Sequence, residues 1–313
     1  MLKGRVINLN GGIYKVLLED SNIISVKARG KLRSEKQYAV NQKSYSKKAV
    51  LQTIKNSPKV GDIVYIENDM IDHYEPRKNE LIRPDIANVD QILLVFAAKE
   101  PDFSFYLLDL FIVNIIKQNI KPCIVISKID KLNDNELNDL KKSLEYYQNM
   151  GYPVLYVNSK SGEGVDKVKE ALDNKITVLS GQTGAGKSTL INAIIPDFNL
   201  KTSEISFALG RGKHTTRETN LYIYNNGFIG DTPGFSKLDV LGVDKNELSS
   251  LFIDFKDYSC RFKDCNHTEN IMGCSIKEAA KNGEILSSRY DSYLKMYKQL
   301  LEGEKKWKYL YQF

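Results

Sequence analysis

The segment Gly181–Ser188 fits the pattern G-x-x-x-x-G-K-[ST], whose chemistry is the binding of a polyphosphate. Its glycines let backbone N–H groups turn inward around the phosphates. Lys187 can reach the outer phosphates, and the Ser188 hydroxyl can ligand Mg²⁺. A glycine-rich turn without a ligand is the alternative, disfavoured because an apolar strand pattern at Ile176–Leu179 precedes the segment and a helical pattern follows it. The candidate phosphate-binding residues are Gly181, Gln182, Thr183, Gly184, Ala185, Gly186, Lys187, Ser188 and Thr189.

A second candidate site lies earlier in the chain and resembles the N/T-K-x-D element with which GTPases read the base. It comprises Ser127, Lys128, Ile129 and Asp130. The two Asp130 oxygens can accept hydrogen bonds from guanine N1–H and the exocyclic amine together, and adenine offers no such donor pair. The Lys128 stem can lie over the base plane. Ser127 stands where Asn is expected to hold neighbouring loops, so we expect softer nucleotide discrimination or a bond through water.

Two further segments extend the candidate nucleotide site. The first follows a predicted strand, at the place where GTPases carry an S-A-K-like loop with a backbone N–H for guanine O6, and comprises Asn158, Ser159 and Lys160. The second is the D-x-x-G element Asp231–Gly234, at the end of an apolar strand. Asp231 would hold Mg²⁺ through water, and the Gly234 N–H would sense the γ-phosphate.

The segment 210–217, between the phosphate loop and the D-x-x-G element, has the character of a switch. Thr216 is the predicted Mg²⁺ ligand in this switch, with Thr215 as the alternative. A hydroxyl at this point can ligand the metal only when the γ-phosphate holds the loop closed. The predicted magnesium ligands are therefore Ser188, Thr216 and Asp231.

Hydrolysis in such a site needs a positioned water and stabilisation of charge. In many GTPases a Gln directly after D-x-x-G orients the water, but Phe235 occupies that position here and cannot hydrogen-bond to it. Our hypothesis is that His214 orients the water after a partner docks, the alternative being that it is only a surface contact. Lys187 and Thr216 complete the predicted catalytic set.

The order of these segments is a circular rotation of the usual one. The two base-reading elements come first, then the phosphate loop and then the two switches, whereas an ordinary GTPase begins with the phosphate loop. Because all these loops are expected at the carboxyl ends of neighbouring strands, a rotated connectivity leaves the three-dimensional site intact. The D-x-x-G switch is then joined directly to whatever follows it in the chain.

A cluster of thiols and one imidazole lies near the end of the chain, with the spacing C-x4-C-x-H-x6-C. Three thiolates and an imidazole satisfy a tetrahedral Zn²⁺ with no open position, so the predicted site is structural. Disulfides are the alternative, disfavoured in a chain without a visible secretory signal. The predicted zinc ligands are Cys260, Cys265, His267 and Cys274.

Composition favours a soluble protein of two or three domains, since 313 residues contain 42% hydrophobic and 27% charged residues. The apolar runs are far too short to span a membrane and no secretory signal follows Met1, so we expect a cytoplasmic protein with no membrane partner. The net charge of +6 arises within residues 1–83. Such a basic excess suits contact with a phosphate backbone, although a solvated lysine-rich surface is the alternative.

The elements that must position these residues fall into three groups. The first 68 residues favour a small all-β barrel of the oligonucleotide/oligosaccharide-binding (OB) type, or else an SH3-like barrel, with strands at Gly4–Asn8, Ile13–Leu18, Ile23–Ala28 and Ile63–Glu67. Residues 69–88 have the composition of a linker, and the part from about 240 looks helical.

Between them, strands alternate with helices, which predicts a parallel sheet covered on both faces. The predicted strands are Gln91–Ala97, Cys123–Ser127, Val154–Val157, Ile176–Leu179 and Phe228–Gly230. The predicted helices lie near 104–118, 135–149, 164–173 and 187–195.

With these elements assembled, the chain resembles the circularly permuted GTPases of the RsgA (YjeQ/YloQ) family over nearly its whole length. The resemblance rests on the permuted order, Gly-Lys-His-Thr-Thr at 212–216, Asp231–Phe235, the Cys/His cluster and Ile86–Asp90. It implies a multidomain α/β protein: an OB-fold-like RNA-binding domain at 1–70, a circularly permuted G domain at 71–240 and a helical zinc-binding domain at 241–313. The chain departs from the family at Ser127 and in the spacing before Cys274, which is one residue longer than expected.

The resemblance also implies a function. A family member would bind GTP or GDP with Mg²⁺, hold one structural Zn²⁺ and bind the small (30S) ribosomal subunit, its 16S rRNA and proteins, late in maturation. GTP hydrolysis would be stimulated by that subunit, and we expect a monomer. Two other classes stay open. One is a GTP/GDP-gated RNA- or ribosome-binding switch with little hydrolysis, with which Phe235 in place of a catalytic Gln is compatible. The other is a P-loop ATPase or kinase, which Asp130 and the basic β-domain disfavour.

Overall fold

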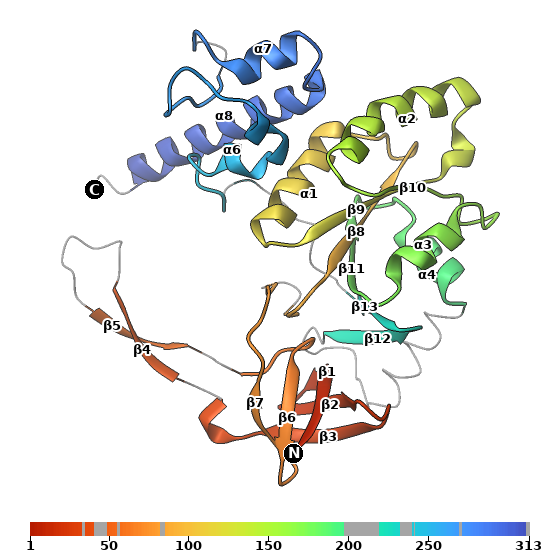
Figure 1. Ribbon diagram of the computed structural model, residues 1–313, viewed down its shortest axis with the longest axis vertical. Helices are drawn as coiled ribbons and strands as arrows, with labels where there is room; N and C mark the ends of the chain where they lie inside the picture. The colour runs from red at the N-terminus through yellow and green to blue at the C-terminus, as the bar shows by residue number, and fades with distance from the viewer. Residues whose placement is uncertain are drawn as a thin grey trace. The chain divides into compact units, whose positions relative to one another are not determined.

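The structure is a computed structural model that describes residues 1–32, 35–40, 49–54, 57–81, 85–196, 219–231, 240, 242–268 and 271–310 (Figure 1). Its contacts divide the chain into two compact units. The first comprises Met1–Val89, Asn174–Thr177 and Gly212–Pro233, and the second comprises Asp90–Asp173, Val178–Arg211 and Gly234–Phe313. The three domain boundaries given above stay a prediction.

The first unit contains a closed five-stranded barrel. Its strands are β1 (Leu2–Asn10), β2 (Ile13–Leu18), β3 (Ile23–Ala28), β6 (Ile63–Glu67) and β7 (Met70–Tyr74). They pair in the order β1-β2-β3-β7-β6, β1 also pairs with β6, and β3–β7 is the parallel pair. Alternate side chains such as Tyr14, Val16 and Leu18 of β2 point into the barrel and are buried, as a period of two requires. The predicted OB-like barrel is confirmed.

One hairpin of this unit was not predicted, and a second hairpin was predicted only in part. β4 (Glu35–Val40) and β5 (Ala49–Ile54) form a separate antiparallel sheet in the basic stretch, for which charge alone was considered. β12 (Asn220–Tyr224) pairs with β13 (Gly227–Asp231) and, at Asn220, with Asn8 of β1. Of this second hairpin, the sequence predicted only β13.

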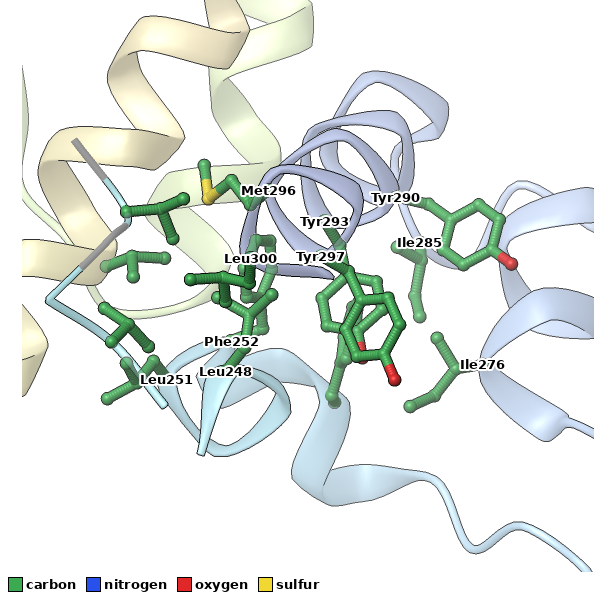
Figure 2. Packing of buried hydrophobic residues seen from close by; sticks show 14 of the residues in the cluster. Leu248, Leu251, Phe252, Ile276, Ile285, Tyr290, Tyr293, Met296, Tyr297 and Leu300 are labelled. Carbon is green, nitrogen blue, oxygen red and sulfur yellow. The ribbon is translucent and has the colours of Figure 1, made fainter. Parts of the chain in front are cut away.

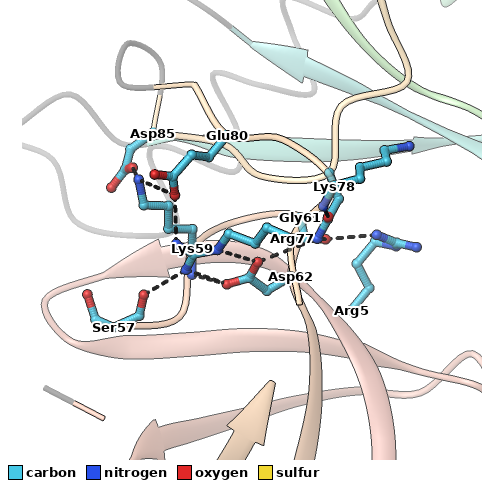
Figure 3. Close-up of polar contacts among 10 residues, drawn as sticks. Arg5, Ser57, Lys59, Gly61, Asp62, Arg77, Lys78, Glu80 and Asp85 are labelled. Carbon is cyan, nitrogen blue, oxygen red and sulfur yellow. Dashed lines mark hydrogen bonds and ion pairs between the residues drawn. The ribbon is translucent and has the colours of Figure 1, made fainter. Parts of the chain in front are cut away.

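The described part of the segment 69–88, residues 69–81 and 85–88, is folded onto the barrel, and the expectation of a linker was wrong for it. It contributes β7 and also Arg77, which binds both carboxylate oxygens of Asp62 at 2.8 and 2.9 Å and the Ser57 carbonyl at 2.9 Å (Figure 3). Burial opposes the charged guanidinium, yet the hydrogen bonds and charge of the fully buried Asp62 raise the pKa of Arg77. A composition rich in Pro, Arg and Asn does not reveal such a distant partner.

The second unit contains the α/β sheet, with strand order β10-β9-β8-β11. Its strands are β8 (Gln91–Ala97), β9 (Lys121–Ser127), β10 (Val154–Tyr156) and β11 (Ile176–Gly181), the last beginning in the first unit. Its helices are α1 (Phe105–Lys117), α2 (Asp134–Asn149), α3 (Val165–Leu172) and α4 (Lys187–Ile194). β8–β9 and β9–β10 are parallel, and β8 is buried along its whole length, as a sheet covered on both faces requires.

The predicted α/β elements are confirmed to within two residues at either end. Local chemistry explains this agreement at the helix ends. Ser104 caps α1, and at α2 the Asn133 side chain accepts from the Glu136 N–H while the Glu136 carboxylate accepts from the Asn133 N–H, both at 2.9 Å.

The C-terminal part is helical and belongs to the second unit. It contains α6 (Leu248–Leu251), the 3₁₀-helix η3 (Ile253–Asp257), α7 (Ser275–Lys281) and α8 (Ser287–Leu310). Their buried side chains form one cluster, in which Tyr293, Met296 and Leu300 of α8 face Leu248 and Phe252 (Figure 2). The cluster also includes residues of α1, so the C-terminal helices share a core with this helix of the α/β part. Within the described parts of the chain, no helix combines the length and apolarity that crossing a bilayer demands.

Candidate functional site

One pocket of about 190 Å³ joins the base-reading segments to the phosphate loop. Asp130 and Gly186 lie on its wall although the phosphate loop follows the base-reading segment in the chain. The carboxyl ends of β9, β10 and β11 lie at the same edge of the sheet, which brings the three loops together. Lining residues are Ser127, Lys128, Asp130, Lys131, Asn158, Ser159, Lys160, Gly186 and Thr189.

The phosphate loop joins β11 to α4 and requires its glycines. Gly181 has a φ of +126°, and a Cβ there would lie 2.1 Å from the Val95 carbonyl oxygen of β8, so no larger residue fits. Gly184 and Gly186 also have positive φ, at +78° and +84°, and α4 begins at the next residue, Lys187. The N-terminal N–H groups of such a helix are ready to bind an anion.

The Lys187 ammonium lies inside this loop. It donates to the Gly181 carbonyl at 2.9 Å and to the Gln182 carbonyl at 2.7 Å. The side chain is half-buried, and this burial lowers the pKa of Lys187. A phosphate entering the loop would meet a cation that is already partly desolvated, which strengthens their attraction.

Ser127 ties the base-reading segment to the phosphate loop. Its side chain is buried, and its hydroxyl donates to the Ala185 carbonyl and also lies 3.1 Å from the Phe96 carbonyl. The sequence led us to expect softer nucleotide discrimination or bonding through a water at Ser127, and the softer discrimination stays a prediction. The direct bond arises because β9 brings Ser127 close enough to the loop, a distance that the sequence alone does not give.

The other base-reading residues are held by nearby backbone groups. Lys128 has a left-handed backbone with φ of 56°, and its ammonium donates to the Glu100 carbonyl. Asp130 follows within the 3₁₀-helix η2 (Ile129–Lys131). The Asn158 side chain accepts a hydrogen bond from the backbone N–H of Lys160 at 3.1 Å, and this bond shapes the loop Asn158–Lys160 after β10.

Sequence reasoning missed two features of this pocket. Lys131 lines it and pairs with the Glu100 carboxylate. Glu100 and Asp102 lie in the loop after β8. The Glu100 carbonyl accepts a hydrogen bond from Lys128, and the Asp102 carbonyl accepts one from Gln182. Their position directly after a buried strand was a signal that could have indicated this edge of the sheet.

Several predicted residues cannot be placed in the pocket. His214, Thr216 and Gly234 lie outside the described residues, and Asp231 is described only as the last residue of β13. Ser188, in the first turn of α4, is exposed. The predicted magnesium set therefore stays a prediction.

The four predicted ligands of the Cys/His cluster do come together. Their ligand atoms all lie within 4.8 Å of one another, with Cys260 Sγ 3.5 Å from His267 Nδ1 and 3.8 Å from Cys274 Sγ. Cys274, whose spacing departed from the family, lies in the cluster with the rest. Burial raises the pKa of the Cys274 thiol to about 12 and lowers the pKa of His267, so the imidazole is neutral at physiological pH. Three thiols and a neutral imidazole make a donor set for a metal ion.

Three kinds of comparison agree with these observations. A family model described as RsgA GTPase matches residues 74–241. The small ribosomal subunit biogenesis GTPase RsgA of Onion yellows phytoplasma (strain OY-M) is 42% identical over 310 residues, covering 96% of this chain and 98% of that protein. The protein of the same name from Pediococcus pentosaceus is 41% identical, covering 97% of this chain and 94% of its own length.

Solved structures give the same result. The crystal structure of YjeQ from Thermotoga maritima matches with a TM-score of 0.78 and 33% identity, covering 96% of this chain and 98% of that one. The structure of YloQ, described as a circularly permuted GTPase, matches with a TM-score of 0.76 and 32% identity, covering 96% of each chain. Together with the pocket and the permuted order of its loops, these matches show that the chain belongs to the RsgA family of circularly permuted GTPases.

Proposed function

We propose that this protein binds GTP in the pocket at the edge of the α/β sheet and hydrolyses it during maturation of the small ribosomal subunit. The single observation that carries the proposal is the pocket shared by Asp130 and the phosphate loop. A carboxylate there fits the donor pair of guanine, while Gly186 and Lys187 lie where the phosphates would follow. The role in maturation of the small subunit is inferred from the relatives, which are named for biogenesis of the small ribosomal subunit.

Base recognition is assigned to Asp130, supported by Ser127 and by the loop Asn158–Lys160. Asp130→Asn replaces one carboxylate oxygen with the NH₂ group of an amide. This group is a hydrogen-bond donor and would face the exocyclic amine of guanine, which is also a donor, so one hydrogen bond is lost. We expect GTP affinity to fall about 30-fold, the effect of losing one hydrogen bond to a charged group. Xanthosine triphosphate, which carries a carbonyl in place of that amine, should gain affinity. Competition against a fluorescent guanine nucleotide measures both changes, and unchanged guanine selectivity would refute the assignment.

Hydrolysis is assigned to a water held by the switch segment, with Lys187 and Thr216 on the phosphates and Mg²⁺ held by Ser188, Thr216 and Asp231. Since Phe235 cannot orient the water, His214 takes this role in our proposal. A GTP/GDP-gated switch with little hydrolysis is the alternative function, because Phe235 is compatible with both the hydrolase and the switch.

Phosphate release with purified ribosomal subunits tests this function. We expect small subunits, and not large ones, to raise GTP turnover by the parent protein. His214→Ala should lose the stimulation and keep its GTP affinity, because the imidazole acts on the water and not on the ground-state nucleotide. Equal stimulated rates for the variant and the parent would exclude this role of His214, and a parent that small subunits bind but do not stimulate would favour the gated switch.

The Cys/His cluster is assigned to one structural Zn²⁺, held by Cys260, Cys265, His267 and Cys274. Zn–S bonds of about 2.3 Å in a tetrahedron place two sulfurs about 3.8 Å apart. The Cys260–Cys274 separation is 3.8 Å, which supports this metal. Four protein ligands leave no open position, so the ion would hold the loop and not take part in hydrolysis.

The remaining assignments follow from the family and from charge. The protein acts as a cytoplasmic monomer, with 16S rRNA and proteins of the small subunit as its partners. The basic excess of residues 1–83 supports contact of the barrel domain with RNA phosphates. Binding to small subunits should therefore weaken as salt is added.

A further inference from the structure

A buried ion pair joins the C-terminal helix α8 to helix α1 of the α/β part. Arg289 of α8 has no exposed surface, and its Nη1 lies 2.7 Å from Oδ1 of the equally buried Asp109 of α1. The Tyr147 hydroxyl of α2 donates to the same Asp109 oxygen at 2.8 Å, and Asp254 binds the other side of the guanidinium at 2.8 Å. Because desolvation offsets most of the attraction, such a pair does more to fix one arrangement of its elements than to add stability.

The same helix α1 is held by α8 over further turns. The Tyr106 hydroxyl donates to Gln299 at 2.9 Å, and the Lys295 ammonium lies 4.0 Å from the centre of the Tyr106 ring. Leu110 and Val113 of α1 belong to the same buried cluster as Tyr293, Met296 and Leu300 of α8. A displacement of α8 therefore has to carry α1 with it or break these contacts.

The segment that leads into α1 lies against the nucleotide pocket. This β8–α1 loop, residues 98–104, belongs to none of the nucleotide-binding motifs described above. Its Glu100 carbonyl accepts from the Lys128 ammonium, and its Asp102 carbonyl accepts from Gln182 Nε2 of the phosphate loop at 3.2 Å. The loop thus contacts both the base-reading and the phosphate-binding parts of the pocket.

We propose that Arg289 and Asp109 are positioning residues for the nucleotide pocket. They fix α1 against the C-terminal helices, and α1 fixes the β8–α1 loop, which holds Lys128 and Gln182. The inference rests on the proposed function, since it concerns the affinity of the same pocket. A macromolecular partner that moves α8 changes nucleotide affinity, and by reciprocity the nucleotide changes the affinity for that partner. This connection is separate from the direct chain link between the D-x-x-G element and the C-terminal helices.

The test is the dissociation rate of a fluorescent GDP and a fluorescent GTP analogue, measured by stopped flow below the unfolding temperature of every variant. Arg289→Met keeps the length of the side chain and removes its charge. We expect it to raise both dissociation rates about tenfold, within the usual range of coupling between sites. The matched control is Arg77→Met, which breaks the comparable Arg77–Asp62 pair of the barrel and should leave both rates unchanged.

A double variant separates positioning from general destabilisation. Gln182→Ala removes the bond between the phosphate loop and Asp102. If α1 acts through the β8–α1 loop, Arg289→Met has a smaller effect in this background than in the parent, because part of the connection is already lost. Fully additive effects, or an equal increase in the Arg77→Met control, would overturn the inference.

A second variant covers the case in which Arg289→Met fails to fold. Asp109→Asn keeps the shape of the side chain and leaves Arg289 paired with Asp254, so it should fold and still raise both rates. Parental rates in this variant would refute the inference and leave the proposed function standing. A parent protein that binds no guanine nucleotide would refute both.

Discussion

Replacing Cys260 by Ser should release the metal and unfold the loop that carries the Cys/His cluster, the largest loss of stability that we expect from one substitution. This loop has little apolar core of its own, since Phe262 is 51% and Met272 87% exposed. Besides the proposed zinc ion, hydrogen bonds to α8 hold it: Tyr290 donates to the His267 carbonyl at 2.9 Å and Tyr293 to the Asn266 carbonyl at 2.8 Å. The Asn266 side chain also donates to the Tyr297 hydroxyl at 3.1 Å.

A structural zinc ion contributes roughly 10–16 kcal/mol of binding free energy to the folded state of a small domain. Loss of one thiolate should therefore lower the free energy of unfolding by at least about 3 kcal/mol. Metal analysis should find about one zinc per chain in the parent and almost none in Cys260→Ser. Limited proteolysis should then cut the variant between α6 and α7.

The chain provides a matched control for this experiment. Cys123 is the one cysteine outside the cluster, buried in β9. Cys123→Ala should keep its zinc and its resistance to protease. If Cys260→Ser retained the metal and the parental thermal stability, the four residues would not form a zinc site.

Lys187→Ala should raise the dissociation constant for GTP about 100-fold. The ammonium now binds two carbonyls of its own loop, and phosphate oxygens would replace them as stronger partners. Two hydrogen bonds to a charged group, at about 1.5 kcal/mol each, account for a change of that size. Isothermal titration calorimetry measures it directly.

The matched control is Lys131→Ala, which removes a lysine that lines the pocket beside the base-reading segment and pairs with Glu100. Its GTP affinity should stay close to that of the parent, because an exposed ion pair contributes little. A comparable loss in both variants would mean that general positive charge, and not the place of Lys187, attracts the nucleotide.

The pH dependence gives a second check on Lys187. Because burial lowers the pKa of Lys187, its charge is present below that pKa and is lost as the pH rises through it. GTP affinity of the parent should therefore fall on the alkaline side, in a range below that of an ordinary lysine. The variant lacks this group, so the difference between the two pH profiles isolates its contribution.

The sequence by itself determined the helices and strands of the α/β part, four strands of the barrel and the chemistry of the local motifs, but not β4, β5, β7 or β12. Strands such as β2, β3, β6 and β8 have the bounds that alternating or continuous apolar patterns predict, because these patterns reflect burial of neighbouring residues. The phosphate loop, the K-x-D segment and the Cys/His spacing were also evident, since their chemistry depends on residues close together in the chain. The permuted order of the loops and the family followed from the same local patterns.

Only the tertiary structure decided how distant residues complete the site. The Ser127 hydroxyl reaches Ala185, 58 residues away, and Arg289 pairs with Asp109 across 180 residues. Arg77 binds Asp62 and so holds a predicted linker on the barrel, and carbonyls of the β8–α1 loop bind Lys128 and Gln182. Each of these contacts uses a side chain or a carbonyl that is common in loops and helices. Its role depends on which partner the fold brings within about 3 Å, and that distance is set by the packing of whole elements.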